Sequence, residues 1–217
     1  MIRSPRRRVA ALVAIAALVA GCTGGSSATP SATASAVQSG SAAACPTAQP
    51  APLPAGETRT VTIETGKGTI VVKVEGALSP IAAGNFVALA GCGFYDGVVF
   101  HRVATLQDGT PFVIQGGDPT GTGTGGPGYQ IQDEPVTATY GRGTVAMART
   151  QAPNSVGSQF FIVLDDRDRD VLASANTYQI IGTVAGGMEA VDAIYGAADA
   201  ELPSDPVAMT RVTIATP

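Results

Sequence analysis

Four short stretches of the 217-residue chain contain the side chains best suited to chemistry. They are Phe100-His101-Arg102, residues 112–118, Met147-Ala148-Arg149 and residues 157–161. Each stretch sets an arginine or a glutamine among aromatic or aliphatic residues. An arginine offers a permanent charge and a planar set of hydrogen-bond donors.

The common catalytic and cofactor motifs are missing or incomplete in this sequence. His101 is the only histidine, which excludes a site built from several histidines. Residues 121–126 spell G-x-G-x-x-G, but Pro127-Gly128 follows where a dinucleotide-binding fold needs a helix. Ser158 lacks the second glycine of a nucleophile elbow. Residues 165–170 lack the glycine and final glutamate of a calcium loop, and we interpret them as a solvated turn. We expect neither a metal nor a cofactor.

Alternating apolar patterns predict the strands that position the four stretches. The alternation on both sides of Gly66-Lys67-Gly68 predicts a hairpin. Six further apolar segments follow between glycine-rich turns, at residues 98–102, 112–115, 144–148, 160–164, 178–184 and 207–214. Ser79-Pro80 predicts the start of a helix that stops at Gly91, and residues 188–195 have helical spacing. The expected fold class is mainly β: an eight-stranded antiparallel barrel capped by two α-helices, preceded by a disordered tether.

The composition divides the chain into three parts. Arginines among residues 3–8 and the apolar run 9–20 have the pattern of an export signal, too short to span a bilayer as a helix. From there to Gly56 the chain has no charged residue, which predicts disorder. All 17 acidic residues, six Phe and five Tyr lie at or after Glu57. We therefore expect a signal peptide over 1–21, a tether over 22–56 and a folded domain over 57–217.

The charge balance argues against a nucleic-acid partner. The net charge is −4, and without the four leader arginines nine basic residues face 17 acidic ones, a net charge of −8. Phosphate backbones are bound by clustered Lys and Arg, so we expect no nucleic-acid partner. Separately, we expect the protein to be a monomer.

The three cysteines point to export. Val19-Ala20-Gly21-Cys22 looks like the lipobox of bacterial lipoproteins, in which the cysteine carries the lipid and becomes the new N-terminus. This resemblance implies a lipid anchor at Cys22, on the extracytoplasmic face of a bacterial membrane in the cell envelope. The alternative is an ordinary signal peptide with an incidental cysteine. Cys45 and Cys92 then remain as an even pair in an oxidising compartment, which favours a disulfide over two free thiols.

In collinear order, the four stretches, the glycine loop 121–126 and Ile181-Gly182-Thr183-Val184 resemble the cyclophilin family of peptidyl-prolyl cis-trans isomerases. The similarity covers about Thr60 to Ile214. It implies a barrel of eight antiparallel strands with two helices and an enzyme that isomerises X-Pro bonds without a cofactor or a metal.

The resemblance also implies roles for single residues. Its catalytic set corresponds to Arg102, Phe112, Gln115 and Phe161, and its substrate-binding set to Val113, Ala148, Arg149, Gln159, Leu172 and Tyr178. Arg102 would donate to the prolyl nitrogen as the bond twists, and Gln115 would steady Arg102. The proline ring would enter an apolar slot, and residues before the proline would meet the backbone near Ala148. His101 is expected to be a structural hydrogen-bonding residue, and Phe160 a core residue.

The chain departs from the family pattern in four places, one of which is Tyr178, where His is common. Nine residues separate Arg102 from Phe112 where the commoner pattern has four, so we expect the insertion around 106–110 to bulge at the rim. Arg149 stands where Asn is usual and would add charge beside the groove. Val171-Leu172 replaces a Trp-Leu pair.

We therefore expect a membrane-tethered peptidyl-prolyl cis-trans isomerase that acts on Pro-containing exported polypeptides. The alternative is a non-catalytic chaperone or binding module with the same fold, and a purely structural envelope lipoprotein is a weaker third reading. Arg102 favours the enzyme, because proline binding alone needs only the apolar slot.

Overall fold

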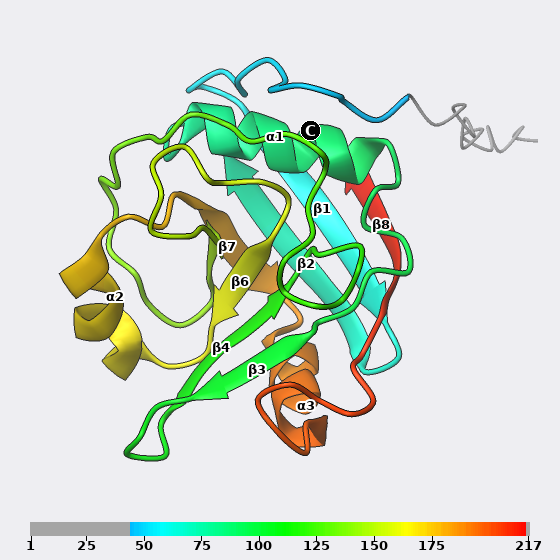
Figure 1. Cartoon of the computed structure of the whole chain (residues 1–217), viewed down its shortest axis with the longest axis vertical. Coiled ribbons are helices and arrows are strands. Elements are labelled where there is room, and N and C mark those ends of the chain that lie inside the picture. The colour runs from blue at the N-terminus through cyan, green and yellow to red at the C-terminus, as the bar shows by residue number, and fades with distance from the viewer. Residues whose placement is uncertain (1–43, 216–217) are drawn as a thin grey trace, which may run out of the picture. The chain divides into compact units, whose positions relative to one another are not determined.

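The structure, a computed structural model, describes residues 44–215 of the chain (Figure 1). Eight strands form one antiparallel sheet in the order β3-β4-β6-β5-β7-β2-β1-β8. The strands are β1 (Thr58–Thr65), β2 (Gly68–Glu75), β3 (Arg102–Thr105), β4 (Pro111–Gly116), β5 (Thr144–Met147), β6 (Phe160–Val163), β7 (Ile180–Gly186) and β8 (Met209–Ala215). The helices are α1 (Pro80–Gly91), α2 (Arg169–Ala175) and α3 (Met188–Ala197), with a 3₁₀ turn at Asp166–Asp168. The predicted strand number and antiparallel pairing are confirmed.

The two edge strands, β3 and β8, meet through the segments that precede them. Val99 bridges Ala208. The backbone N–H of Phe100 donates to the carbonyl of Val207 at 2.9 Å. These contacts curl the sheet into a barrel. The segment 98–102, predicted as a strand, contributes only this bridging, and regular pairing begins at Arg102.

Helices α1 and α3 cover opposite ends of the curled sheet (Figure 1). Phe86 and Leu89 of α1 and Val191 and Ile194 of α3 are buried in the core inside the barrel. These are the two capping helices that the sequence predicts.

Strands β4 and β6 place apolar side chains on both faces of the sheet, and those on the outer face form a second hydrophobic cluster. Ile114 and Ile162 point into the core inside the barrel, whereas Val113, Phe161 and Val163 belong to a separate cluster on the other face. Successive side chains of a strand point to opposite faces, so each of these strands serves both clusters. Leu172 of α2 packs into the second cluster and shields it from water.

The short helix α2 corrects two expectations, the solvated turn at 165–170 and the total of two helices. The Asp165 side chain accepts a hydrogen bond from the Arg167 N–H at 2.9 Å, and the Asp165 N–H donates to Asp168 Oδ2 at 3.2 Å. This reciprocal cap starts the helical segment. Leu172 is then the one buried residue of α2 itself, Arg169–Ala175. The Asp-x-x-Asp spacing was the available signal.

The last part of the expected tether is ordered, which corrects the boundary at residue 56. A disulfide joins Cys45 to Cys92 with an S–S distance of 2.10 Å. Leu53 is buried, and its N–H donates to the carbonyl of Pro80 at 2.9 Å. The segment 44–56 therefore lies across α1, as Figure 1 shows in blue.

Two predictions concern residues outside the described part of the chain. The export signal over 1–21 and Cys22, with the tether up to residue 43, all fall there. Among the helices of residues 44–215, none has the length and apolarity to cross a membrane.

Candidate active site

A row of paired residues crosses the sheet on its outer face. Arg102 of β3 pairs with Gln115 of β4, and Gln115 pairs with Phe161 of β6. Phe161 in turn pairs with Ala146 of β5. Paired residues on neighbouring strands point to the same face, so the pairing brings a guanidinium, an amide and an aromatic ring together.

Arg102, Gln115 and Phe161 of this row border a cavity of about 260 Å³. Its apolar wall includes Val113, Phe161 and Leu172, each nearly inaccessible to solvent. The rings of Phe161 and Tyr178 meet edge to face with centroids 5.3 Å apart. The lining brings together all the residues of the predicted catalytic and binding sets except Gln159: Arg102, Phe112, Val113, Gln115, Ala148, Arg149, Phe161, Leu172 and Tyr178.

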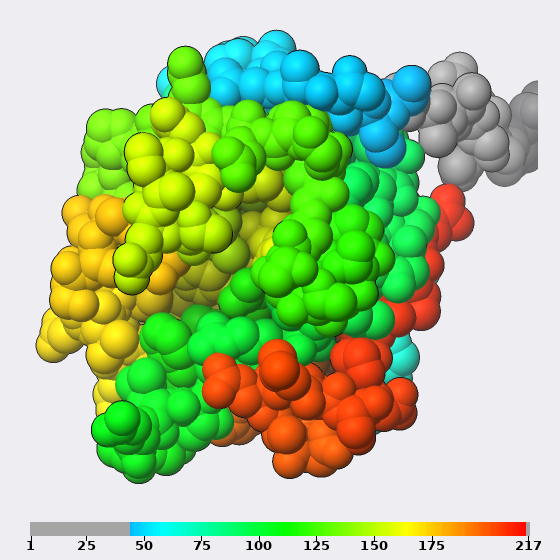
Figure 2. Space-filling model, in the orientation of Figure 1, coloured from blue at the N-terminus to red at the C-terminus, as the bar shows by residue number. Residues whose placement is uncertain are grey.

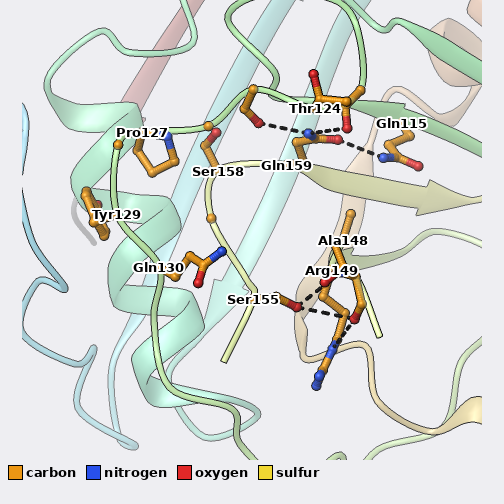
Figure 3. Close-up of a pocket in the computed structure, with 16 residues that line it drawn as sticks. Gln115, Thr124, Pro127, Tyr129, Gln130, Ala148, Arg149, Ser155, Ser158 and Gln159 are labelled. Atoms are coloured by element: carbon orange, nitrogen blue, oxygen red, sulfur yellow. Dashed lines mark hydrogen bonds between the residues drawn. The ribbon is translucent and has the colours of Figure 1, made fainter. Parts of the chain in front are cut away.

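Gln159 belongs to a hydrogen-bonded chain that starts at Arg102. Arg102 Nη1 donates to Gln115 Oε1 at 3.4 Å, and Gln115 Nε2 donates to Gln159 Oε1 at 2.9 Å. Gln159 Nε2 donates to the carbonyls of Gly123 at 3.0 Å and Gly125 at 2.9 Å. Figure 3 shows Gln159 between Gln115 and the glycine-rich loop. The loop therefore orients both amides, so that an oxygen of Gln115 faces Arg102.

A larger groove of about 660 Å³ adjoins this cavity and shares Gln115, Ala148 and Arg149 with it. The glycine-rich segment 123–128 forms one side, and residues 155 and 157–159 contribute to the other. Figure 2 shows this face hollowed between the green and the yellow-green segments. Because they share lining residues, the two hollows form one continuous depression on this face.

Arg149 does not add charge to the groove, which corrects the expectation from the sequence. Its side chain is only 10% exposed, and Nη1 lies 3.0 Å from Asp133 Oδ1. Nε and Nη2 donate to the carbonyls of Thr150 at 3.0 Å and Ala152 at 2.7 Å. The guanidinium is thus neutralised and bonded within its own wall of the groove.

Glu201 is a site neighbour that the sequence did not suggest. Arg102 Nε donates to Glu201 Oε1 at 2.7 Å, across 99 positions of the chain. Glu201 lies in the loop between α3 and β8, which carries no recognisable motif. Only the tertiary contact identifies it.

The insertion between Arg102 and Phe112 leaves the site intact. Residues 106–110 form a tight turn in which the Leu106 N–H donates to the carbonyl of Thr110 at 2.8 Å. Thr105 pairs with Pro111, so β3 and β4 extend as a hairpin and Phe112 still lines the cavity.

Two titratable groups beside the glycine-rich loop, His101 and Asp118, have lowered pKa values. Burial lowers the pKa of His101, so its ring is neutral at pH 7. A hydrogen bond with the backbone of Val99 opposes this lowering without outweighing it. Burial alone would raise the pKa of Asp118, but N–H groups of Gly125 and Thr120 outweigh it and hold this pKa well below its usual value. No group of three or more potential metal ligands occurs in this part of the chain.

The comparisons with known proteins agree with this geometry. Residues 60–214 match the family model described as cyclophilin type peptidyl-prolyl cis-trans isomerase/CLD. A peptidyl-prolyl cis-trans isomerase of Arabidopsis thaliana is 38% identical over 143 residues, covering 64% of this chain and 81% of the relative. Peptidyl-prolyl cis-trans isomerase A of Mycobacterium tuberculosis is 37% identical over 178 residues, covering 72% and 92%.

A solved structure supports the same assignment. The crystal structure of a cyclophilin type peptidyl-prolyl cis-trans isomerase from Cryptosporidium parvum has a TM-score of 0.64 and 31% identity, and the match covers 74% of this chain and 99% of that one. A second structure of that protein, in the presence of the dipeptide Ala-Pro, has a TM-score of 0.63. From the sequence match, the fold and the site together, the chain belongs to the cyclophilin type peptidyl-prolyl cis-trans isomerase family.

Proposed function

We propose that this protein accelerates the cis–trans isomerisation of X-Pro bonds in exported polypeptides while a lipid holds it at a membrane. One observation carries the catalytic part of the proposal. The guanidinium of Arg102 and the apolar wall formed by Phe112, Val113, Phe161 and Leu172 border the same cavity. The apolar wall suits a proline ring, and the guanidinium at its edge suits the amide bond before that ring, which has to be twisted.

The chemistry needs only a lower rotational barrier. Twisting an amide out of plane destroys its resonance, at a barrier of about 18–20 kcal/mol. As the bond twists, the prolyl nitrogen becomes pyramidal and regains a lone pair that accepts a hydrogen bond. A donor that binds this nitrogen more strongly in the twisted state lowers the barrier. Arg102 would be that donor, since its charge is permanent and its donors are planar.

The neighbouring residues would hold the substrate in place. The proline ring would occupy the apolar cavity, which keeps water from competing with the arginine for the twisted bond. The residues before the proline would lie along the adjoining groove, past Ala148 and Gln159. The related structure in the presence of Ala-Pro supports this choice of substrate class.

The catalytic proposal is tested by following cis–trans relaxation of a proline peptide with the full chain and with Arg102→Ala. We expect the variant to lose at least about 100-fold in kcat/KM, the range typical of removing a donor that stabilises a transition state. Arg211→Ala is the matched control, because Arg211 is an exposed arginine of β8 that does not line the cavity. Its activity should equal that of the wild type.

A different result points to a different function. If the wild-type chain binds proline peptides but does not speed their relaxation, the protein is a binding module or chaperone. If Arg102→Ala retains full activity, another group carries the reaction.

The proposed place of action depends on the sequence and on one structural feature. The lipobox-like residues ending in Cys22 support a lipid anchor, and the Cys45–Cys92 disulfide supports an oxidising compartment outside the cytoplasm. Mass spectrometry of the protein from a bacterial membrane fraction should find the N-terminus at an acylated Cys22, and Cys22→Ser should release the protein from that fraction. An unmodified Cys22 in the membrane fraction contradicts the anchor.

A further inference from the structure

The loop between α3 and β8 is held beside the active site by contacts of its own. Within the loop, the N–H of Ser204 donates to Asp199 Oδ1 at 3.0 Å, and its hydroxyl donates to Asp199 Oδ2 at 2.6 Å. These bonds close residues 199–204 into a compact turn. The carbonyl of Glu201 accepts a hydrogen bond from the N–H of Val103 at 2.8 Å, which ties the turn to β3. In Figure 2 the orange-red atoms of this part of the chain lie against the green atoms of the β3–β4 region.

The side chain of Glu201 contacts Arg102 at Nε, the guanidinium nitrogen farthest from the two terminal NH₂ groups. Its Oε1 accepts from Arg102 Nε at 2.7 Å, while Gln115 Oε1 accepts from Nη1 at 3.4 Å. For Nη2 the described residues offer no hydrogen-bond partner. Two acceptors therefore hold the guanidinium at two of its three nitrogens, and the third remains available to a substrate at the cavity.

We propose that Glu201 is a positioning residue for catalysis, which sets the orientation of the Arg102 guanidinium toward the twisting bond. A long arginine side chain samples many rotamers in solution, and a guanidinium has strong directional preferences as a donor. The bond to Nε fixes the rotation of the guanidinium plane without using the donors that a substrate needs. Gln115 alone does not do this, since its single contact at 3.4 Å is long.

A role in stability alone does not account for this contact. The side chains of Arg102 and Glu201 are 34% and 59% exposed, and exposed ion pairs contribute little to folding. The anchoring of the turn through Val103 uses the backbone of Glu201 and survives any change of its side chain. Geometry at a reacting centre is far more sensitive, because small displacements of a catalytic group reduce rates steeply.

Two substitutions separate position from charge. Glu201→Asp retains the charge but draws the acceptor back by one methylene, so we expect kcat to fall about 5- to 20-fold with KM within twofold. Glu201→Gln loses the charge but retains an acceptor at the same reach, so its kcat should stay within about threefold of the wild type. Asp205→Asn is the control, because Asp205 is an exposed carboxylate of the same loop that makes no bond to Arg102. All variants are made in the full chain and compared by thermal melting.

The link to Arg102 is tested in an Arg102→Lys background, where no Nε–H of a guanidinium remains. There, Glu201→Asp should change kcat less than twofold. Full activity of Glu201→Asp, a larger loss in Glu201→Gln than in Glu201→Asp, or equal losses in both backgrounds would overturn the proposal. The inference rests on the proposed isomerase activity: an inactive wild-type chain removes both proposals, whereas an active wild type with an unaffected Glu201→Asp removes this one alone.

Discussion

At the scale of single residues, the two arginines beside the cavity differ in what their side chains do. The guanidinium of Arg102 contacts only side chains, Gln115 and Glu201, and one of its nitrogens has no bond within residues 44–215. The guanidinium of Arg149 is bonded to Asp133 and to two backbone carbonyls. Arg102 is therefore free to interact with a substrate, whereas Arg149 stabilises the wall on which the substrate would lie.

The first prediction concerns Arg149→Ala. This change removes the charged donor of Asp133 and of the carbonyls of Thr150 and Ala152. Asp133 keeps the Asn154 N–H, and both carbonyls keep the Ser155 hydroxyl. Loss of the ion pair and of two charge-assisted hydrogen bonds should lower the free energy of unfolding by about 1–3 kcal/mol. The preference between peptides with Glu or Lys before the proline should stay the same, because the guanidinium contributes little charge to the groove. Thermal melting and kcat/KM for the two peptides measure both effects. A marked loss of activity toward the Glu peptide alone would show that Arg149 does contact the substrate.

At the scale of the elements, a contact from a distant loop fixes how α1 begins. Ser79 precedes α1 but makes no capping bond with its side chain. Instead, Glu134 accepts hydrogen bonds from the N–H groups of Ile81 and Ala82, both at 2.9 Å. A carboxylate at a helix N-terminus is favoured by the helix dipole. The loop that precedes β5 is thereby attached to α1.

The second prediction concerns the pH dependence of stability that Asp168 causes, at the end of the 3₁₀ turn before α2. Asp168 is completely buried, one of its carboxyl oxygens has no partner within the described residues, and burial raises its pKa to about 6. The folded protein therefore holds the proton more tightly than the unfolded chain does. The stability from this group is complete below about pH 4 and is lost as the pH rises through about 6, with a slope of up to about 1.4 kcal/mol per pH unit.

Asp168→Asn should remove this part of the pH dependence. Urea unfolding at intervals between pH 4 and 7 measures it, as the difference between variant and wild type. Asp170→Asn serves as the control, because Asp170 is an exposed carboxylate two residues further along, in the first turn of α2. Parallel curves for the wild type and Asp168→Asn would mean that Asp168 is ionised throughout this range.

At the scale of the whole described domain, the segment 44–56 is a structural part rather than a linker. Helix α1 is buried on the side that this segment covers, and its Gly84 permits the approach: a Cβ at this position would lie 2.3 Å from the carbonyl oxygen of Ala51. Glycine lowers helix propensity, so its place inside α1 is explained by this contact. Gln49 extends the contact by accepting the Gln132 N–H at 2.9 Å.

The third prediction concerns the Cys45–Cys92 disulfide, which closes a loop with a sequence separation of 47. Removing such a cross-link costs about 2–4 kcal/mol through the entropy of the unfolded chain. A reducing agent should therefore lower the melting temperature, and hydrogen exchange should increase first in residues 45–56 and in α1. A Cys45→Ser variant should behave as the reduced protein does. Equal melting temperatures with and without reductant would contradict this.

The sequence by itself determined the elements and the composition of the site. Period-two patterns such as Ile70, Val72 and Val74 predict strands because a side chain facing the core must be apolar. The resemblance assigned ten residues to the site, and nine of them line one cavity in the structure. Of the elements, α2 was missed, since a helix with one buried residue has no periodic signal.

Only the tertiary structure decided which polar groups are partners. Glu201 and Arg102 lie 99 positions apart, Glu134 and Ile81 53, and no local pattern connects either pair. The tertiary structure also decided the place of the segment 44–56. Its composition predicts disorder, but the disulfide and the buried Leu53 hold it on α1. Local propensity and periodicity are properties of neighbours along the chain, whereas these contacts depend on how the curled sheet brings its loops together.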